Sequence, residues 1–235
     1  MVFQRPHQKS PRAIQKAYRF RALTGVVDVE PLLLEIDALP PEAWLASQWK
    51  WHLGTWFLIL RGGPQTEVPG SPLAGGGGID APVLGRLPAL RHVIDTAFPA
   101  PAPLAWVGLS PPQSCIRLHV DNLAWWDEHH RIHVPLRTSP GARLCADGHF
   151  QHLPAGTMWA FDNSRPHGAL NDGPPRLHLV VDLPPTEAVE RWIAAGVDHP
   201  GAPDEVALAR LRQNPLDALQ LADLQGDLLV RLLDQ

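Results

Sequence analysis

The chain of 235 residues has little cysteine and no long apolar run, and these two absences exclude several classes of protein. Its two cysteines, Cys115 and Cys145, form no CxxC pair. The spacing of a disulfide framework is therefore missing, and we expect two free thiols, with one disulfide between them as the alternative. No stretch approaches 18 uninterrupted apolar residues, which excludes a transmembrane helix, and we expect no membrane partner.

An excess of positive charge is also missing. The chain has 20 Lys and Arg against 24 Asp and Glu, for a formal net charge of −4. Nucleic-acid-binding domains have a basic surface, so we expect no nucleic-acid partner. The first residues, MVFQRPHQKSPR, are polar and contain no apolar segment like that of a signal peptide, so we expect a cytoplasmic protein.

Proline and glycine, in contrast, are plentiful. The 26 Pro and 19 Gly make about a fifth of the chain prone to turns. This composition suits many short strands joined by loops. The length is sufficient for one such domain with a helical appendage.

From Leu104 onward, alternating apolar and polar residues predict short strands. We place them at 104–109, 115–119, 131–136, 143–146, 149–153, 157–161, 167–170 and 176–182. Asp147-Gly148 and Asp172-Gly173 are expected as hairpin-type turns between strands. Residues 1–20 are expected to form a basic, partly disordered lead-in.

Helical spacing predicts helices on both sides of this strand-rich region. The expected helical segments are 30–39, 42–47, 86–98, 187–195, 204–213 and 215–234, with one early strand at 55–60. The glycine-rich segment 69–78 lacks the GK[ST] ending of a phosphate loop and is expected as a mobile loop, either a lid or plain surface. The last helix has an apolar stripe that we expect to pack on the core, with a homodimer contact as the alternative: Leu224, Leu228, Leu229 and Leu232.

Three side chains have the spacing of a metal site. His119 and Asp121 stand two residues apart, so that on one strand they would face the same side. His167 follows 48 residues after His119, among turn and strand signals. Two histidines and one carboxylate are the set that binds non-haem Fe(II) on one face and leaves coordination positions open. An HxD sequence also occurs by chance, but the ordered distal histidine favours a metal site.

Two strands with the pattern RxH flank the histidine and carboxylate set. In each, an arginine and a histidine alternate with aliphatic residues: Arg131 and His133 in the first, Arg176 and His178 in the second. One surface strand would alternate in the same way, but two of them favour a polar barrel interior with the aliphatic face packed outward against helices. An iron oxygenase also needs a fixed cation for a 2-oxo acid cosubstrate, and Arg176, nine residues after His167, is the candidate.

The chain resembles a known family through an ordered set of motifs. These are H-x-D, R-x-H-x-P-L, D-G, L-x-x-G-x-x-W-x-F-D-N, a distal H, and R-x-x-L-x-x-D. The residues that carry them are His119, Asp121, Arg131, His133, Pro135, Leu136, Asp147, Gly148, Leu153, Gly156, Trp159, Phe161, Asp162, Asn163, His167, Arg176, Leu179 and Asp182. Over residues 104–183 the chain is similar to the aspartyl/asparaginyl β-hydroxylases and the related proline hydroxylases.

This resemblance implies a mainly β fold, the double-stranded β-helix, also called a jelly roll or cupin. We expect an oxygenase domain at 1–185, with its core at 104–183 and N-terminal helices, and a C-terminal helical extension packed on it at 186–235. The resemblance further implies Fe(II) bound by His119, Asp121 and His167, O2 as co-reactant, and 2-oxoglutarate as cosubstrate. Arg176 would pair with the distal carboxylate of 2-oxoglutarate, and Arg131 and His133 would line its pocket.

One departure from the family concerns the substrate. Members that hydroxylate acidic residues have a second arginine two positions before the R-x-H arginine, where this chain has His129. A largely neutral imidazole is a poor anchor for a carboxylate. Trp125 and Trp126 follow the metal motif closely, and we expect these three residues at the substrate entrance.

The resulting hypothesis is a 2-oxoglutarate-dependent hydroxylase of an uncharged amino-acid side chain within a peptide, without catalytic residues beyond the metal ligands. Three alternatives stay open. One is a hydroxylase of a free amino acid such as proline. The others are a metal cupin without oxygen chemistry and a binding module that has lost catalysis.

Overall fold

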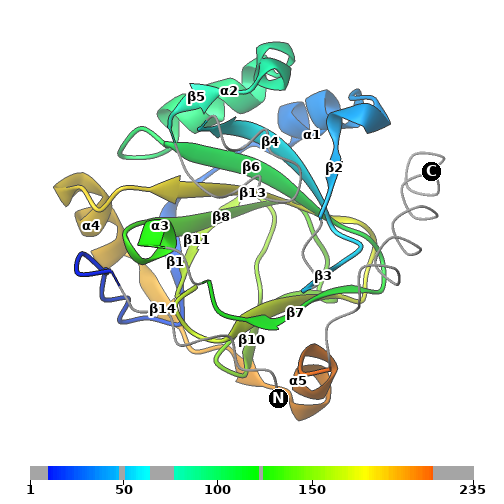
Figure 1. Cartoon of the computed structure of the whole chain (residues 1–235), viewed down its shortest axis with the longest axis vertical. Helices are drawn as coiled ribbons and strands as arrows, with labels where there is room; N and C mark the ends of the chain where they lie inside the picture. The colour runs from blue at the N-terminus through cyan, green and yellow to red at the C-terminus, as the bar shows by residue number, and fades with distance from the viewer. Residues whose placement is uncertain (1–9, 48–50, 64–76, 122–123, 214–235) are drawn as a thin grey trace.

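In the computed structural model, which describes residues 10–47, 51–63, 77–121 and 124–213, two antiparallel sheets face each other (Figure 1). Within these residues the larger sheet has nine strands. Eight of them follow one another across the sheet: β14 (Val197–His199), β1 (Phe20–Val26), β11 (Thr157–Phe161), β8 (His130–Arg137), β13 (Arg176–Leu183), β6 (Leu104–Ser110), β4 (Trp56–Gly62) and β2 (Leu45–Ala46). The ninth, β5 (Ile79–Asp80), pairs with β4.

The smaller sheet has six strands within the described residues. In order across the sheet they are β15 (Ala202–Pro203), β10 (His149–His152), β9 (Ala142–Ala146), β12 (His167–Asn171), β7 (Ser114–His119) and β3 (His52–Leu53). The strands from β6 to β13 divide equally between the sheets, and the chain crosses repeatedly from one sheet to the other. This topology is the double-stranded β-helix, as the family resemblance implies.

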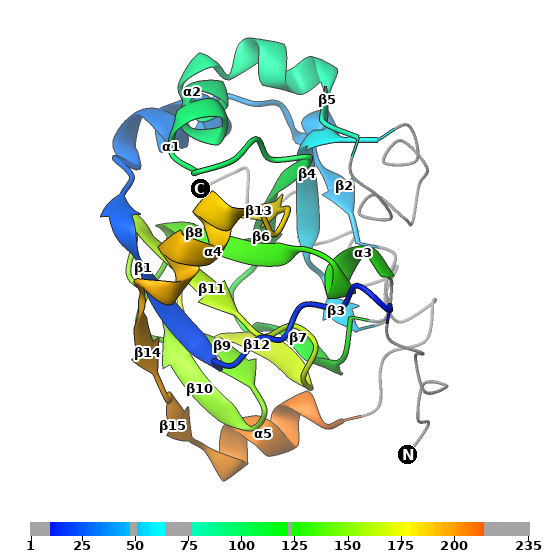
Figure 2. The same ribbon diagram turned by 90° about the vertical axis from the view of Figure 1, so that its left-hand side faces the viewer.

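Helices cover the outer faces of both sheets (Figures 1 and 2). Among the described residues they are α1 (Glu30–Asp37), α2 (Pro88–Thr96), α3 (Ala124–Asp127), α4 (Glu187–Ala194) and α5 (Glu205–Leu211), with 3₁₀ turns at Pro41–Ala43 and Pro82–Arg86. The first, second and fourth pack on the larger sheet, and α5 packs on the smaller sheet.

The alternation in β8 and β13 decides which side chains face the interior. The aliphatic residues of both strands belong to the main core with α1, α2 and α4: Ile132, Val134, Leu136, Leu177, Leu179 and Val181. The arginine and histidine of each RxH pattern face the opposite way and line the space between the sheets. The predicted polar interior with an aliphatic exterior is therefore confirmed.

The strands predicted between 104 and 182 are all present, with ends that differ by one residue at most. The longest of the strands that were not predicted is β1. Residues 20–26, the end of the expected lead-in and the chain just beyond it, form β1, which pairs with β11 and β14. Its sequence, FRALTGV, does not alternate between apolar and polar residues, and only Phe20 and Leu23 are buried. The hydrogen bonds with its neighbouring strands, rather than its own pattern, therefore make it a strand.

Two local expectations are wrong. Asp172-Gly173 is no hairpin turn, because it joins β12 of the smaller sheet to β13 of the larger one. The helical turn expected at 42–47 ends early: a 3₁₀ turn spans Pro41–Ala43, after which Leu45 and Ala46 pair with β4. Asp147-Gly148 does form a tight turn between β9 and β10, with positive φ at both residues, as Asp-Gly sequences favour.

Helices α1, α2, α4 and α5 lie where the sequence predicts them, and the strand expected at 55–60 is β4. Between α4 and α5, two short strands extend the edges of both sheets. The final helix at 215–234 with its leucine stripe, and nearly all of the 69–78 loop, lie outside the described residues. Cys115 and Cys145 are free thiols, as expected. No helix within the described residues is long and apolar enough to span a membrane.

Candidate metal and cosubstrate site

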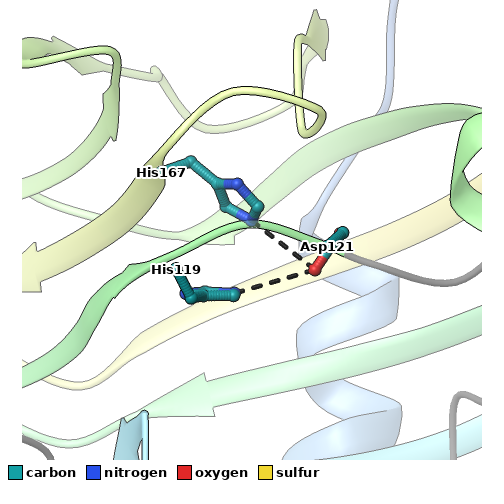
Figure 3. Close-up of side chains that lie close together, drawn as sticks. All are labelled: His119, Asp121 and His167. Carbon is teal, nitrogen blue, oxygen red and sulfur yellow. Dashed lines mark ion pairs between the residues drawn. The ribbon is translucent and has the colours of Figure 1, made fainter. Parts of the chain in front are cut away.

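The three predicted metal ligands lie together at one end of the smaller sheet (Figure 3). His119 ends β7 and His167 begins β12, and these two residues are direct partners in the antiparallel register. Asp121 follows two residues after the end of β7. One ligand atom from each residue lies within 4.8 Å of the others. Sheet pairing therefore brings together residues that are 48 positions apart in the sequence.

Hydrogen bonds to backbone carbonyls orient both imidazoles in the same way. Nδ1 of His119 lies 2.7 Å from the carbonyl oxygen of Arg117, and Nδ1 of His167 lies 2.9 Å from that of Arg165. A carbonyl only accepts, so Nδ1 carries the proton in each ring and Nε2 has the free lone pair. Both Nε2 atoms lie 3.7 Å from Oδ1 of Asp121. Such carbonyl bonds are the usual way in which proteins orient metal-binding histidines.

The other oxygen of Asp121 is occupied by hydrogen bonds. Oδ2 accepts from Nη1 of Arg131 at 2.6 Å and from Nδ2 of Asn163 at 2.9 Å. Burial alone would raise the pKa of Asp121, but the Arg131 guanidinium, together with the hydrogen bond from Asn163, outweighs it and holds the pKa well below its usual range. The carboxylate is therefore ionised at neutral pH, with Oδ1 directed at the two histidines.

Burial keeps His167 neutral. It lowers the pKa of this imidazole to about 3, and the proximity of His119 adds to the shift. A neutral imidazole is the form that binds a metal ion. Two imidazole nitrogens and one carboxylate oxygen on one side of a cavity fit Fe(II), whose remaining positions would stay open.

A cavity of about 90 Å³ lies between the two sheets beside the three ligands. One water needs only ~10–15 Å³, so the cavity has room for a small molecule. Its wall includes the metal ligands, both RxH pairs and a set of apolar and aromatic side chains, among them Phe57, Trp106, Leu109, Ile116, Leu144, Phe161 and Val180.

Arg176 is a buried cation in this wall. Its side chain donates from Nε to Nε2 of His178 at 3.0 Å and weakly from Nη1 to Ser110 at 3.4 Å, and the residue is 6 % exposed. Among the residues that the structure describes, no carboxylate pairs with it. Burial without a neutralising partner lowers the pKa of Arg176 to about 10, so it stays charged at neutral pH. A buried, unneutralised guanidinium is a site for an anion.

His133 lies next to this guanidinium and also has hydrogen-bonding capacity to spare. Its Nδ1 is 3.3 Å from Nδ1 of His178, and its Nε2 is buried with no partner among the described residues. Burial and the charge of Arg176 hold the pKa of His133 well below its ordinary value. A neutral imidazole with an unused nitrogen in the cavity wall is suited to bind a ligand oxygen.

Arg131 lies in the same wall but has two carboxylate partners. Besides Asp121, it contacts Asp182 through Nε at 2.9 Å and Nη2 at 3.1 Å. Its guanidinium also stacks over Trp106 and Trp126, 4.9 and 5.4 Å from the ring centroids. The cavity thus contains one neutralised arginine and one arginine without an acidic partner.

The three residues expected at the substrate entrance do not line this cavity. Trp126 is 5 % exposed and packs in the interior with Trp106 and Val180, so its place is the core. Trp125 donates from Nε1 to Asp182 at 2.9 Å, and His129 stacks on it with ring centroids 3.6 Å apart. Both are partly buried, and Trp125 shares its acceptor Asp182 with Arg131.

Four residues around the site could not be recognised from the sequence as its supports. Asn163 and Asp182 belong to the shared motifs, but nothing in their spacing indicated that they support Asp121 and Arg131. His52, on β3, lies in the cavity wall with its ring 5.6 Å from that of His119. Lys16 contacts Asn163 from a segment more than 100 residues away. Only a three-dimensional structure could reveal such a contact.

Part of this chain is similar to known hydroxylases. Residues 80–185 match the family model described as Aspartyl/Asparaginyl beta-hydroxylase. A curated relative, the L-proline cis-4-hydroxylase of Rhizobium meliloti (strain 1021), is 28% identical over 114 residues. The match covers 48% of this chain and 41% of the relative, so it spans less than half of that protein.

Solved structures with similar folds include two prolyl hydroxylases. One, from Trichoplax adhaerens in complex with a hypoxia inducible factor peptide fragment, is 11% identical with a TM-score of 0.49, over 76% of this chain and 87% of that one. The other, a prolyl-4-hydroxylase from Pseudomonas putida, is 17% identical with a TM-score of 0.43, over 72% of this chain and 93% of that one.

Proposed function

We propose that this chain is an Fe(II)- and 2-oxoglutarate-dependent hydroxylase that acts on an sp3 carbon of an amino-acid side chain. The proposal rests on two features of the site that share one cavity. The first is the set His119, Asp121 and His167, and the second is Arg176, a buried cation without a carboxylate partner. The family match over residues 80–185 supports the same class of activity.

Each part of the site has a distinct task in this proposal. When bound, the iron would supply the oxidative chemistry with O2 and 2-oxoglutarate. His119, Asp121 and His167 would hold it on one side, and Arg176 would neutralise the distal carboxylate of 2-oxoglutarate. His133 would donate to or accept from the same cosubstrate. The surrounding apolar side chains would exclude water, which strengthens the charge pairing.

The substrate that we propose is an uncharged side chain, such as Leu, Val or Pro, presented within a peptide. His129, at the position of a substrate-binding arginine in some family members, has a pKa that burial lowers, so it is neutral near pH 7. Of the two arginines in the cavity wall, Arg131 is already neutralised by Asp121 and Asp182. Neither feature favours an acidic substrate. A free amino acid is the second candidate, because the curated relative is a hydroxylase of L-proline by name.

The other two hypotheses fit the cavity less well. A metal cupin without oxygen chemistry has no need of a second, buried cation beside its metal ligands. A binding module without catalysis has no need of three ligand atoms whose orientation is fixed by separate hydrogen bonds. Keeping Arg176 buried and unpaired costs free energy that a bound anion would offset.

The decisive experiment measures the turnover of 2-oxoglutarate to succinate. Purified protein with Fe(II), O2 and 2-oxoglutarate should form succinate, faster with a true substrate than without one. A panel of short peptides and of free amino acids, including proline, is then assayed for a mass gain of one oxygen. Hydroxylation of aliphatic residues in peptides supports the full proposal. Hydroxylation of Asp alone would overturn the substrate, and absence of any succinate would overturn the oxygenase.

A further inference from the structure

The segment that precedes β1 is not part of the matched region 80–185, but in the structure it contacts Asn163 beside the candidate metal ligands. Residues 10–19 run alongside α3 to reach β1 (Figure 2). Two backbone amides anchor this segment: that of Ser10 donates to Oδ2 of Asp127 at 2.9 Å, and that of Ile14 donates to the Asp127 carbonyl at 2.8 Å. The hydroxyl of Ser10 donates to Glu128. The segment is therefore held against the C-terminal end of α3.

This segment inserts one cation into the interior. Lys16 is 7 % exposed, and its ammonium donates to Oδ1 of Asn163 and to the carbonyl of Trp126 at 3.3 Å. None of the described carboxylates lies within ion-pair distance of its nitrogen. Burying an ammonium is costly, and long charged side chains are rarely buried without a specific partner. The partner here is a side-chain amide.

The oxygen and the NH2 group of the Asn163 side-chain amide have different hydrogen-bond partners. Oδ1 accepts from Lys16, and Nδ2 donates to Oδ2 of Asp121 at 2.9 Å. An amide can rotate by half a turn, which would place its oxygen against the carboxylate oxygen of Asp121. The ammonium of Lys16 opposes that rotation because it can only donate. It therefore fixes which end of Asn163 faces the metal ligand.

We propose that Lys16 is a positioning residue for the metal site, acting through Asn163 to hold Asp121 with Oδ1 directed at the metal. The inference rests on the proposed function only in taking Asp121 as a ligand. It also extends the functional unit beyond residues 80–185, since the cation comes from the segment before β1. Oδ2 of Asp121 thus accepts from two donors, Arg131 and the Asn163 amide that Lys16 orients.

The test is a double-mutant cycle on metal affinity rather than on activity. The variants are Lys16→Met, which keeps length but removes the donor, Asn163→Leu, and the double variant. Mn(II) is the probe, because it binds carboxylate and imidazole sites and needs no exclusion of air. Its affinity is measured from the loss of the electron paramagnetic resonance signal of the free ion. Groups that support a metal ligand typically contribute about 10- to 100-fold to affinity.

We expect Lys16→Met to weaken Mn(II) binding about 10-fold. In the Asn163→Leu variant the same substitution should change the Mn(II) affinity by less than about twofold, because the amide that connects Lys16 to Asp121 is already absent. A cation that merely stabilised the fold would produce two independent effects that multiply. Ser10→Ala is the matched control: it loosens the same segment at Glu128 without touching Asn163, and should leave Mn(II) affinity unchanged.

Thermal unfolding of the metal-free variants shows whether each is folded. Lys16→Gln, which is shorter and uncharged but polar, is the second variant for the cycle if Lys16→Met does not unfold cooperatively. Wild-type affinity in both Lys16 variants, or equal effects of the substitution with and without Asn163, would overturn the inference. A failure of the proposed function looks different, because the wild-type protein would then form no succinate or would bind Mn(II) no better than His167→Ala does.

Discussion

Nη1 of Arg131 lies 2.6 Å from Oδ2 of Asp121, and the remainder of the same guanidinium holds Asp182. The sequence predicts this arginine in the cosubstrate pocket, and it does lie in the cavity wall. Its hydrogen bonds, however, tie it to the metal ligand. Arg131 and Arg176 thus share one cavity but have different electrostatic surroundings, and their substitutions should have different effects.

Replacing Arg131 should weaken metal binding more than 2-oxoglutarate binding. Arg131→Leu leaves Asp121 and Asp182 as buried carboxylates without their cation, and breaking a buried pair costs about 3–5 kcal/mol of unfolding free energy. We expect weaker Mn(II) binding together with this loss of stability, measured by titration and by urea unfolding. Normal metal affinity in this variant would show that Arg131 does not orient Asp121.

Replacing Arg176 should affect the cosubstrate alone. Truncating one partner of a buried charge pair costs about 2–5 kcal/mol, so Arg176→Leu should raise the KM for 2-oxoglutarate by at least about 30-fold. Metal affinity should stay as in the wild type. The control is Arg137→Leu, which removes an arginine that pairs with Asp37 at the surface. Calorimetry showing unchanged 2-oxoglutarate binding in Arg176→Leu would remove the basis for an anion site here.

Replacing His167 should abolish turnover. His167→Ala removes one of three ligand atoms and leaves a site with two. We expect no succinate from 2-oxoglutarate and a large loss of metal affinity. His149→Ala is the matched control, because the Nδ1 of His149 contacts a carbonyl two residues earlier, as in the ligands, but its ring lies outside the cavity. Full activity of His167→Ala would show that the distal ligand is assigned wrongly.

Stability of the metal-free protein should fall as the solution is acidified. Burial holds the pKa of His52, His133 and His178 well below the ordinary value of 6.5 and that of His167 at about 3. Below about pH 6.5 the unfolded chain therefore binds protons that the folded chain does not, and the folded state loses stability until the folded pKa is reached.

This loss amounts to about 1 kcal/mol for each such histidine between about pH 7.5 and about pH 5.5. Urea unfolding at the two pH values, in the presence of a chelator, measures it. An unfolding free energy that does not change between them would show that these imidazoles are accessible to protons in the folded protein.

The strand-rich region and the three candidate metal ligands could be identified from the sequence because both depend on its local properties. Alternation over β8 and β13 assigns the aliphatic and polar faces without knowledge of any partner strand. The chemistry of two histidines and one carboxylate is likewise independent of the fold. The resemblance that the ordered motifs carry then implied a double-stranded β-helix.

The supports of the site could be decided only by the tertiary structure. The strand β1 has little pattern of its own and exists because β11 and β14 offer it hydrogen bonds. Trp126 was expected at the entrance and lies in the core, because packing against Trp106 buries it. The contacts of Lys16 with Asn163 and of Arg131 with Asp182 join residues 147 and 51 positions apart. A sequence specifies which groups can pair, but the pairing of distant groups depends on strand order and packing, which bring them within hydrogen-bonding distance.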